Sequence, residues 1–359
     1  MKIKVLVYPY DINPYQNLLY NHMRNGVEIK YLKGSTSSQT INNILLPLLL
    51  IKYRVKGYKI FHLHWTYGFT FPGKNYLSLF FSTIYYYLIL TFIKFTGYKI
   101  VWTVHNILPH EKQFINDIYA SKVLSKLCNV KIVHSKSAID EMRHLDFDIK
   151  NINIIPHGNY IESYVNEITR KEARRILNIN NNDFIFLFFG RVEKYKGIEY
   201  MLNEFSKINN HNIKLIICGA CTDPELLTKI QLYITNSNIT FINKHINNND
   251  IQIFMNASDT VILPFNKINS SGSAILALSF AKTIIAPQKG TLNEMPKNVG
   301  YFYSNGNNNG LYKSMINSIS KRNMLEIIGQ NGYEYIKTFS WNNISKKTLR
   351  LYKELEQKD

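Results

Sequence analysis

A short segment near the middle of the chain places cations beside glycines. Residues 188–197 read FFGRVEKYKG, so Gly190 and Arg191 follow an apolar run, and Lys196 comes just before a helix-like segment. Ligands bind at the carboxyl ends of strands in open α/β sheets, and Arg and Lys are the side chains that hold phosphate oxygens. This segment therefore predicts an anion site, with a diphosphate as the expected ligand.

A second segment could supply the other half of such a site. Ser270, Ser271 and Gly272 are followed by Ser273 and then by the apolar, helix-like residues 274–281. Small residues at the start of a helix let backbone N–H groups approach an anion, and the helix dipole favours negative charge there. In a further loop after a strand, Glu294 is a candidate to accept a hydrogen bond from a sugar hydroxyl.

Histidines gather at expected strand ends in the first half of the chain. His105 closes an apolar strand and opens a polar loop, so it is the candidate for orienting a substrate or for acid–base work. His62 and His64 alternate along one strand and should lie on the same side of it, but no carboxylates or cysteines complete a metal site. The alternative for any of them is a hydrogen-bonded structural group. The acceptor-side candidates are His62, His64, His110, Glu111 and His157.

Strand-length apolar runs alternate with helix-length segments twice along the chain. The first series extends from residues 3–8 to 152–156, and the second from 184–189 to 284–286. This rhythm is typical of parallel sheets covered by helices on both faces, and 359 residues are too many for one ordinary domain. We therefore expect an α/β protein with two doubly wound, Rossmann-like domains. The polar stretch 178–183 indicates a junction between them.

Composition limits the partners and the compartment. The net charge of +18 favours an anionic partner. A basic nucleic-acid-binding protein is the less favoured alternative, because the aromatic residues lie mainly in apolar runs rather than among cations. Cys218 and Cys221 form a lone C-x-x-C without a second pair, so we expect neither metal nor redox chemistry. No signal peptide precedes the first strand, which fits a cytoplasmic protein.

Two segments of the first half look suited to a membrane surface. Residues 76–93 carry no charge over a length at the lower edge of a membrane span, yet they include three consecutive tyrosines and a strand follows closely. Residues 43–51 are apolar and are flanked by Lys52, Arg54 and Lys56. An interfacial surface on the cytoplasmic face of the membrane is one interpretation. Two ordinary helices facing the sheet are the other.

These features together resemble the GT-B glycosyltransferases, specifically the retaining glycosyltransferase family 4. The resemblance covers nearly the whole chain, and its most specific parts are at residues 189–198, 257–265, 290–294 and 339–352. It implies an acceptor-binding domain at 1–170, a nucleotide-sugar-binding domain at 171–335, and a terminal helix at 336–359 that crosses back to the first domain. In that family the two domains face a central cleft.

The resemblance also implies roles for individual residues. Arg191 and Lys196 would stabilise the diphosphate leaving group, amides at 270–272 would bind it, and His245 with Ile246 would flank the base. His105 would orient the sugar or assist proton transfer. The implied activity is that of a hexosyltransferase (EC 2.4) that moves a sugar from a nucleoside-diphosphate sugar to a saccharide acceptor, preferably lipid-linked. No cofactor or metal is implied.

One departure from the family pattern concerns the donor sugar. Many members carry two glutamates around the second phosphate loop, and Ile268 and Leu276 occupy these positions here. This leaves the identity of the donor open more than the class of reaction. It also leaves two alternatives, a catalytically impaired GT-B-like membrane partner and a GT-B nucleotide-sugar epimerase.

Overall fold

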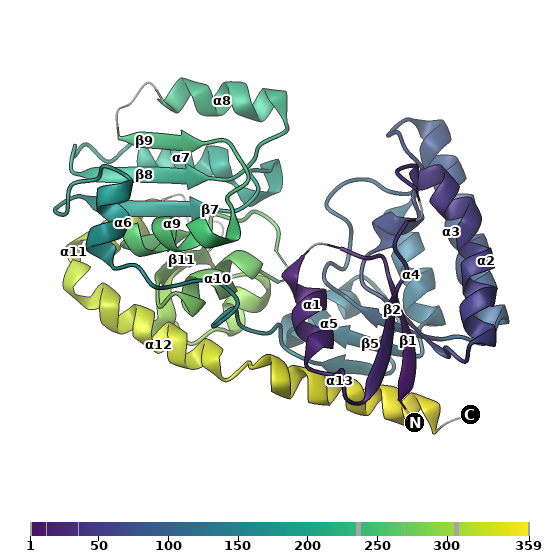
Figure 1. Cartoon of the computed structure of the whole chain (residues 1–359). Coiled ribbons are helices and arrows are strands. Elements are labelled where there is room, and N and C mark those ends of the chain that lie inside the picture. The colour runs from purple at the N-terminus through teal and green to yellow at the C-terminus, as the bar shows by residue number, and fades with distance from the viewer. Residues whose placement is uncertain are drawn as a thin grey trace. The chain divides into compact units, whose positions relative to one another are not determined.

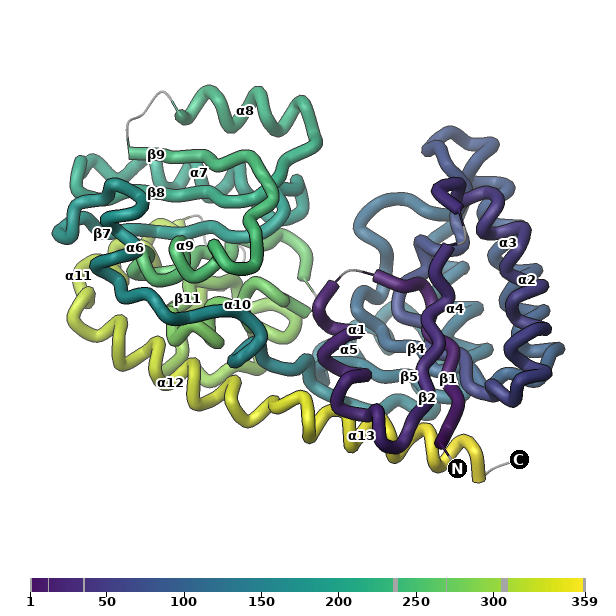
Figure 2. The backbone as a smooth tube through the Cα atoms, in the orientation of Figure 1, coloured from purple at the N-terminus to yellow at the C-terminus, as the bar shows by residue number. Residues whose placement is uncertain are grey.

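The chain folds into two compact units, each built on its own sheet. A computed structural model describes residues 2–11, 13–34, 36–234, 238–268, 270–304 and 309–357. Unit 1 comprises Met1–Gly158 and Ser340–Asp359, and unit 2 comprises Asn159–Phe339. Figures 1 and 2 show unit 1 in purple and blue with the yellow last helix, and unit 2 in teal and green that passes into yellow toward Phe339.

Unit 1 contains a six-stranded parallel sheet in the order β2-β1-β3-β4-β5-β6. Its four central strands are short, mainly apolar runs, as expected for strands that are buried on both faces, whereas the edge strands β2 and β6 are partly exposed. The strands are β1 (Ile3–Tyr8), β2 (Val27–Tyr31), β3 (Ile60–Leu63), β4 (Lys99–Thr103), β5 (Val130–Val133) and β6 (Ile152–Ile154).

Helices cover both faces of this sheet. Because parallel crossovers are right-handed, the four helices that connect β2 through β6 share one face, and their buried residues form a single apolar cluster with the sheet. They are α2 (Gln39–Val55), α3 (Tyr76–Phe95), α4 (Asp117–Leu127) and α5 (Lys136–His144). The other face carries α1 (Pro14–Asn21) and the last helix α13 (Trp341–Glu356), joined where Ser345 Oγ donates to the Leu19 carbonyl at 2.7 Å.

Unit 2 repeats this architecture with the strand order β12-β11-β10-β7-β8-β9, again all parallel. Its strands are β7 (Phe184–Phe189), β8 (Ile213–Cys218), β9 (Ile239–Ile242), β10 (Thr260–Ile262), β11 (Thr283–Pro287) and β12 (Gly300–Tyr303). Its helices are α6 (Arg170–Ile176), α7 (Ile198–Phe205), α8 (Pro224–Ile234), α9 (Ile251–Ala257), α10 (Gly272–Ser279), α11 (Gly310–Ser320) and α12 (Leu325–Lys337). Two six-stranded parallel sheets with alternating helices confirm the expected α/β class.

The boundary between the units lies at Gly158 and Asn159, earlier than residues 170 and 171. The polar stretch 178–183 is not a junction but an internal part of unit 2. The fully buried Arg174 donates from Nη1 to the carbonyls of Asn180, Asn181 and Asp183, at 2.9 to 3.0 Å, and from Nη2 to Asp259 at 2.8 Å. A charged hub therefore orders a segment that composition alone marks as a linker.

Candidate functional site

The two predicted halves of the anion site meet at the carboxyl end of β7. Gly190 has a φ of +127°, and a Cβ at this position would lie 3.1 Å from Ser273 Oγ and 3.3 Å from Lys196 Nζ. The neighbouring strand end is equally tight, because a Cβ on Gly219 would lie 2.0 Å from the Gly190 carbonyl oxygen. Glycine is thus required at both strand ends, and the missing side chain at Gly190 lets a lysine and a hydroxyl approach the backbone there.

Lys196 is the cation placed inside this site. Burial lowers the pKa of its ammonium from the ordinary 10.5 to about 8, while Glu193 opposes and Arg191 adds to that shift. Within the described parts of the chain, Lys196 Nζ has no carboxylate within the 4.0 Å of an ion pair. A desolvated cation without a paired anion is favourably placed to receive a phosphate.

Arg191 occupies a different environment. Its side chain is 76% exposed and pairs with Glu193 Oε1 at 2.9 Å. A guanidinium in such a surface pair gains little from it, so Arg191 can exchange that partner for a phosphate at small cost. The two predicted cations thus differ, since Lys196 is fixed beside the strand end and Arg191 lies at the surface.

The amino end of α10 supplies the remaining part of the anion site. Ser271 caps the helix, and its Oγ accepts a hydrogen bond from the Ala274 amide at 3.0 Å. Gly272 is exposed in the first turn, and Ser273 directs its hydroxyl toward Gly190. Ser270 directly precedes the cap. Free amides of the first turn carry partial positive charge, so they reinforce Lys196.

The other predicted donor residues follow neighbouring strands of the same sheet. His245 is exposed and Ile246 is buried in the loop after β9, and Glu294 ends an exposed helical turn after β11. Because the strands are parallel, these loops share the carboxyl edge with Gly190. The structure therefore brings every predicted donor residue to one edge, although only Gly190, Lys196 and the start of α10 are shown in mutual contact.

In unit 1, four of the predicted histidines gather in one cluster. The rings of His64, His105 and His157 lie 5.8, 4.7 and 4.9 Å from the ring of Tyr15, which belongs to α1. His62 stacks on His64 with the ring centroids 4.4 Å apart, as their alternation along β3 predicts. The cluster lies at the carboxyl edge of this sheet, after strands β3, β4 and β6.

A fifth histidine, His134 after β5, determines how protons are ordered in the cluster. Its Nδ1 lies 2.9 Å from the Ile155 carbonyl oxygen, which can only accept, so His134 carries its proton on Nδ1. Its Nε2 then accepts from His105 Nδ1 at 3.4 Å, His105 Nε2 accepts from His64 Nδ1 at 3.0 Å, and His64 Nε2 accepts from the Tyr20 hydroxyl at 2.8 Å. Neutral imidazoles are required throughout.

Burial keeps these rings neutral. Desolvation lowers the pKa of His62 to about 3 and that of His134 to about 4, and it lowers the pKa of His64 and His105 well below 6.5. Both ring nitrogens of His105 also bond within the cluster, Nδ1 with His134 and Nε2 with His64. A role for His105 in proton transfer would require this hydrogen-bond chain to rearrange on substrate binding.

Two predicted acceptor-side residues lie outside this histidine chain. His110 is exposed, and the exposed Glu111 pairs with Lys74 at 2.9 Å. Sequence reasoning did not single out Tyr15, nor Trp65, whose ring stacks on His105 at a centroid distance of 4.5 Å. His134 could have been included among the candidates on the same signal as His105, since it also lies at the end of a strand.

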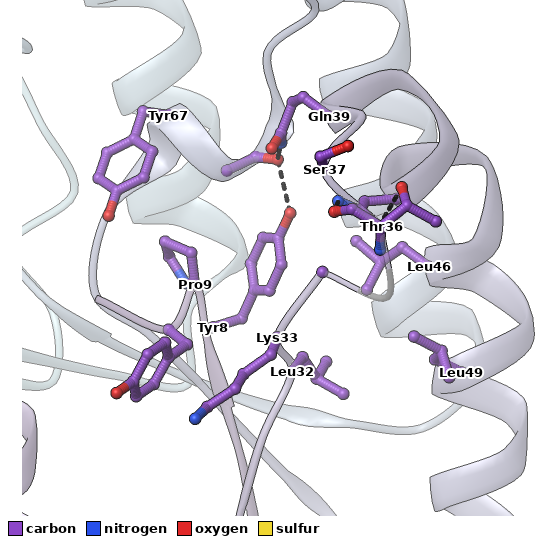
Figure 3. A pocket seen from close by; sticks show the side chains of 14 residues that line it. Tyr8, Pro9, Leu32, Lys33, Thr36, Ser37, Gln39, Leu46, Leu49 and Tyr67 are labelled. Atoms are coloured by element: carbon purple, nitrogen blue, oxygen red, sulfur yellow. Dashed lines mark hydrogen bonds between the residues drawn. The ribbon is translucent and has the colours of Figure 1, made fainter. Parts of the chain in front are cut away.

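A cavity of about 280 Å³ lies beside the cluster's sheet, where β1, β2 and β3 end (Figure 3). Its lining combines apolar and polar groups, with Tyr8 on one side and Lys33 and Gln39 on others. Gln39 Nε2 and the Tyr8 hydroxyl both donate to the Gly68 carbonyl, at 2.6 and 2.5 Å. No sequence pattern indicated this cavity, because its residues come from three loops and the start of α2.

Comparison with known proteins identifies the class. Residues 169–335, most of unit 2, match the family described as Glycosyl transferases group 1. With the two Rossmann-like units, this match supports a glycosyltransferase of the GT-B fold.

Similar proteins of known name support this assignment. A GDP-mannose:glycolipid 4-beta-D-mannosyltransferase of Xanthomonas campestris is 23% identical over 281 residues, which are 77% of this chain and 70% of the relative. The solved structure of sucrose-phosphate synthase from Thermosynechococcus elongatus matches with a TM-score of 0.80 and 16% identity over 100% of both chains. That of HepE from Anabaena with UDP-glucose matches at 0.75 and 12% identity, over 99% of this chain and 100% of HepE.

Proposed function

We propose that this enzyme transfers a hexose from a nucleoside-diphosphate sugar to a glycolipid acceptor, with retention at the anomeric carbon as in glycosyltransferase family 4. Unit 2 would bind the donor and unit 1 the acceptor. The observation that carries the proposal is the convergence of Lys196 Nζ and Ser273 Oγ on Gly190, within the segment that matches the family. The names of the relatives, a glycolipid mannosyltransferase and a UDP-glucose complex, support the substrate classes.

The chemistry of this step is the departure of a nucleoside diphosphate. Negative charge develops on the leaving phosphate, and preorganised cations and amides stabilise it without reorganising. Lys196, Arg191 and the first turn of α10 supply such groups. In the retaining reaction the acceptor oxygen bonds to the anomeric carbon on the face that the phosphate leaves, and the acceptor proton passes to a donor phosphate oxygen. We propose that no metal or cofactor is needed, because protein cations fill that role.

The donor sugar is read by residues other than the paired glutamates. Leu276 is buried inside α10 and Ile268 stands before it, so neither position offers a carboxylate. Glu294 is the one acidic residue in the predicted donor set, and His245 with Ile246 would contact the base. The absence of the two glutamates leaves open which nucleotide and which sugar are bound.

The cavity at the end of β1 to β3 is our candidate for the acceptor saccharide. Sugars present both hydroxyls and apolar ring faces, and the lining offers Lys33 and Gln39 for the former and tyrosine rings for the latter. Lys33 Nζ lies 3.9 Å from the ring centroid of Tyr10, which holds the ammonium at the rim. A lipid-linked acceptor also implies that the enzyme works at the cytoplasmic face of a membrane.

A donor screen followed by a transfer assay tests the proposal. We expect one class among UDP-, GDP-, ADP- and TDP-sugars to raise the melting temperature, and Lys196→Met to abolish that rise. With that donor and a glycolipid extract, Lys33→Ala should raise the acceptor KM about tenfold and leave donor affinity unchanged, since one charged hydrogen bond is removed. Absence of stabilisation by every donor would refute the donor site.

A further inference from the structure

The outward faces of α2 and α3 carry large apolar side chains where crossover helices of soluble proteins are usually polar. On α2 the exposed positions recur every three or four residues, which makes one stripe along the helix. On α3 they form a second stripe. The exposed fractions are 46% for Ile41, 65% for Ile44, 63% for Leu48, 47% for Ile51 and 84% for Val55 on α2, and 61% for Leu77, 53% for Phe81, 41% for Ile84, 65% for Leu88 and 88% for Phe95 on α3.

The two stripes belong to one surface. The helices lie side by side in Figures 1 and 2. Near the start of α2, the Tyr85 hydroxyl of α3 donates to the Asn43 carbonyl at 2.6 Å, and near its end Arg54 Nε donates to the Thr96 carbonyl at 2.9 Å. We call this surface, formed by the outward residues given above, the α2–α3 face. Contiguous apolar surface of this extent marks a contact with a membrane or a protein.

The α2–α3 face can lie on a bilayer but α3 does not cross one in this fold. The helix is long and apolar enough to span, with a mean hydropathy of 1.6. However, β3 and β4 on either side of it are paired neighbours in one sheet, with Ile60 opposite Lys99. Its inner side is also fully buried, at Tyr86, Leu90 and Ile93. A spanning α3 would therefore separate two paired strands and expose this core.

Lysines surround the ends of these helices. Lys52 and Lys56 are exposed at the end of α2. Lys94, in the last turn of α3, lines a cavity of about 610 Å³ together with Lys99, Lys126 and one carboxylate, Glu354, and its Nζ donates to Asn129 Oδ1 at 3.0 Å. Burial and the nearby Lys99 lower the pKa of Lys94, so a bound anion would relieve both effects. Apolar surface rimmed by cations matches the boundary between acyl chains and anionic headgroups.

We propose that the α2–α3 face docks on a bilayer that contains anionic phospholipid, with both helices parallel to its surface and the lysine cavity facing lipid phosphates. The inference rests on the proposed function for its purpose, the delivery of a glycolipid. Gln39 and Asn42, at the start of α2, line the candidate acceptor cavity one turn from Ile41 and Ile44. The cavity residues of α2 lie on the side of the helix opposite Ile41 and Ile44, so docking would hold the cavity about one helix diameter, ~10 Å, from the bilayer that presents a lipid-linked saccharide.

Vesicle flotation of the full-length protein tests the docking surface. Vesicles of phosphatidylcholine with phosphatidylglycerol should carry the protein upward, and vesicles of phosphatidylcholine alone should bind it more weakly. We expect the double variant L48Q/L88Q to weaken binding about tenfold, because apolar area that would enter the bilayer is lost. The control is Leu232→Gln on α8, which is also exposed, at 71%, and should bind as wild type does.

A second pair of variants tests the charge. K52S/K56S should weaken binding to anionic vesicles about 25-fold, or roughly fivefold for each lysine, and leave binding to neutral vesicles unchanged. The matched control K346S/K347S removes two exposed lysines of α13 and should lose much less. If both pairs of variants lost the same vesicle affinity, the assignment of a specific surface would be overturned, because net charge alone would then explain the binding.

The remaining outcomes separate this inference from the proposed function. Stabilisation by the nucleotide sugar reports on unit 2, so a variant that keeps it and loses flotation supports docking without involving the reaction. Unchanged flotation of L48Q/L88Q would overturn the proposal. The proposal would also be overturned if sedimentation showed a dimeric wild type and a monomeric L48Q/L88Q while both proteins floated equally. A second copy of the chain, rather than lipid, would then cover the α2–α3 face.

Discussion

Protonation of Lys196 should control donor binding. Burial holds its pKa at about 8 in the free protein, and a diphosphate placed beside it favours the charged form, so the pKa rises on binding. Binding therefore requires the protonated lysine, and affinity falls as the pH rises through 8. Raising the pH from 7 to 9 reduces the protonated fraction about tenfold, and the donor affinity should fall by the same factor, or about 1.4 kcal/mol.

Titration calorimetry with the nucleotide sugar found in the donor screen measures this slope. Lys196→Arg is the control, because a guanidinium stays charged across this range and any titration of the nucleotide itself would remain. We expect the variant to bind with nearly constant affinity from pH 7 to 9. Lys196→Met should bind about 10- to 100-fold more weakly at pH 7, as expected for the loss of a charged hydrogen bond. Identical slopes for wild type and Lys196→Arg would refute the placement of Lys196 against the diphosphate.

Three further predictions concern the framework of the two units. Gly219→Ala, which forces a Cβ against the Gly190 carbonyl at a φ of +149°, should lower the stability of unit 2 by about 2 kcal/mol or more and reduce donor binding, measured by thermal melting with and without the nucleotide sugar. Arg174→Met should cost about 3 kcal/mol in urea unfolding, because Asp259 Oδ2 and three backbone carbonyls lose their buried donor while Arg170 and Arg322 still pair with Asp259 Oδ1, and adding Asp259→Asn should recover part of the loss. The pKa of His134 lies near 4 in the folded state, below its ordinary 6.5, so the stability that neutral His134 contributes is complete above pH 6.5 and is lost as the pH falls toward 4. Between pH 7 and pH 5 the free energy of unfolding in urea should therefore fall about 2 kcal/mol less in His134→Asn than in wild type. Equal decreases in the two proteins would contradict the assignment of a neutral cluster.

Much of the fold could be predicted because its signals are local. A run such as Phe184–Phe189 is apolar at every position, which is the pattern of a parallel strand buried on both faces, and the spacing of such runs predicts the doubly wound architecture. The meeting of Gly190, Lys196 and the start of α10 could be predicted for the same reason. The two halves of the anion site each combine glycine, small hydroxyls or cations with a strand end, and parallel strands bring those ends to one edge.

Features that depend on contacts between distant residues could not be predicted. Residues 178–183 have the composition of a linker, whereas Arg174 ties their carbonyls into unit 2 and the boundary lies earlier, at Gly158 and Asn159. The strand β12, Gly300–Tyr303, is short and begins with glycine, so it lacks the apolar run that marks the others. The hydrogen-bond order in the histidine chain depends on a single carbonyl, that of Ile155, which no residue pattern reveals.

The last helix has a consequence for how the protein is made. Unit 1 includes residues 340–359, and within it the buried Tyr352 hydroxyl bonds His62 Nδ1 at 2.5 Å. A ribosome must therefore finish the whole of unit 2 before it releases the segment that completes unit 1. The first unit to be synthesised is the last to close, and a nascent chain held before residue 340 would expose the face of the sheet that α13 covers. Truncation at the carboxyl terminus should accordingly damage the amino-terminal unit first.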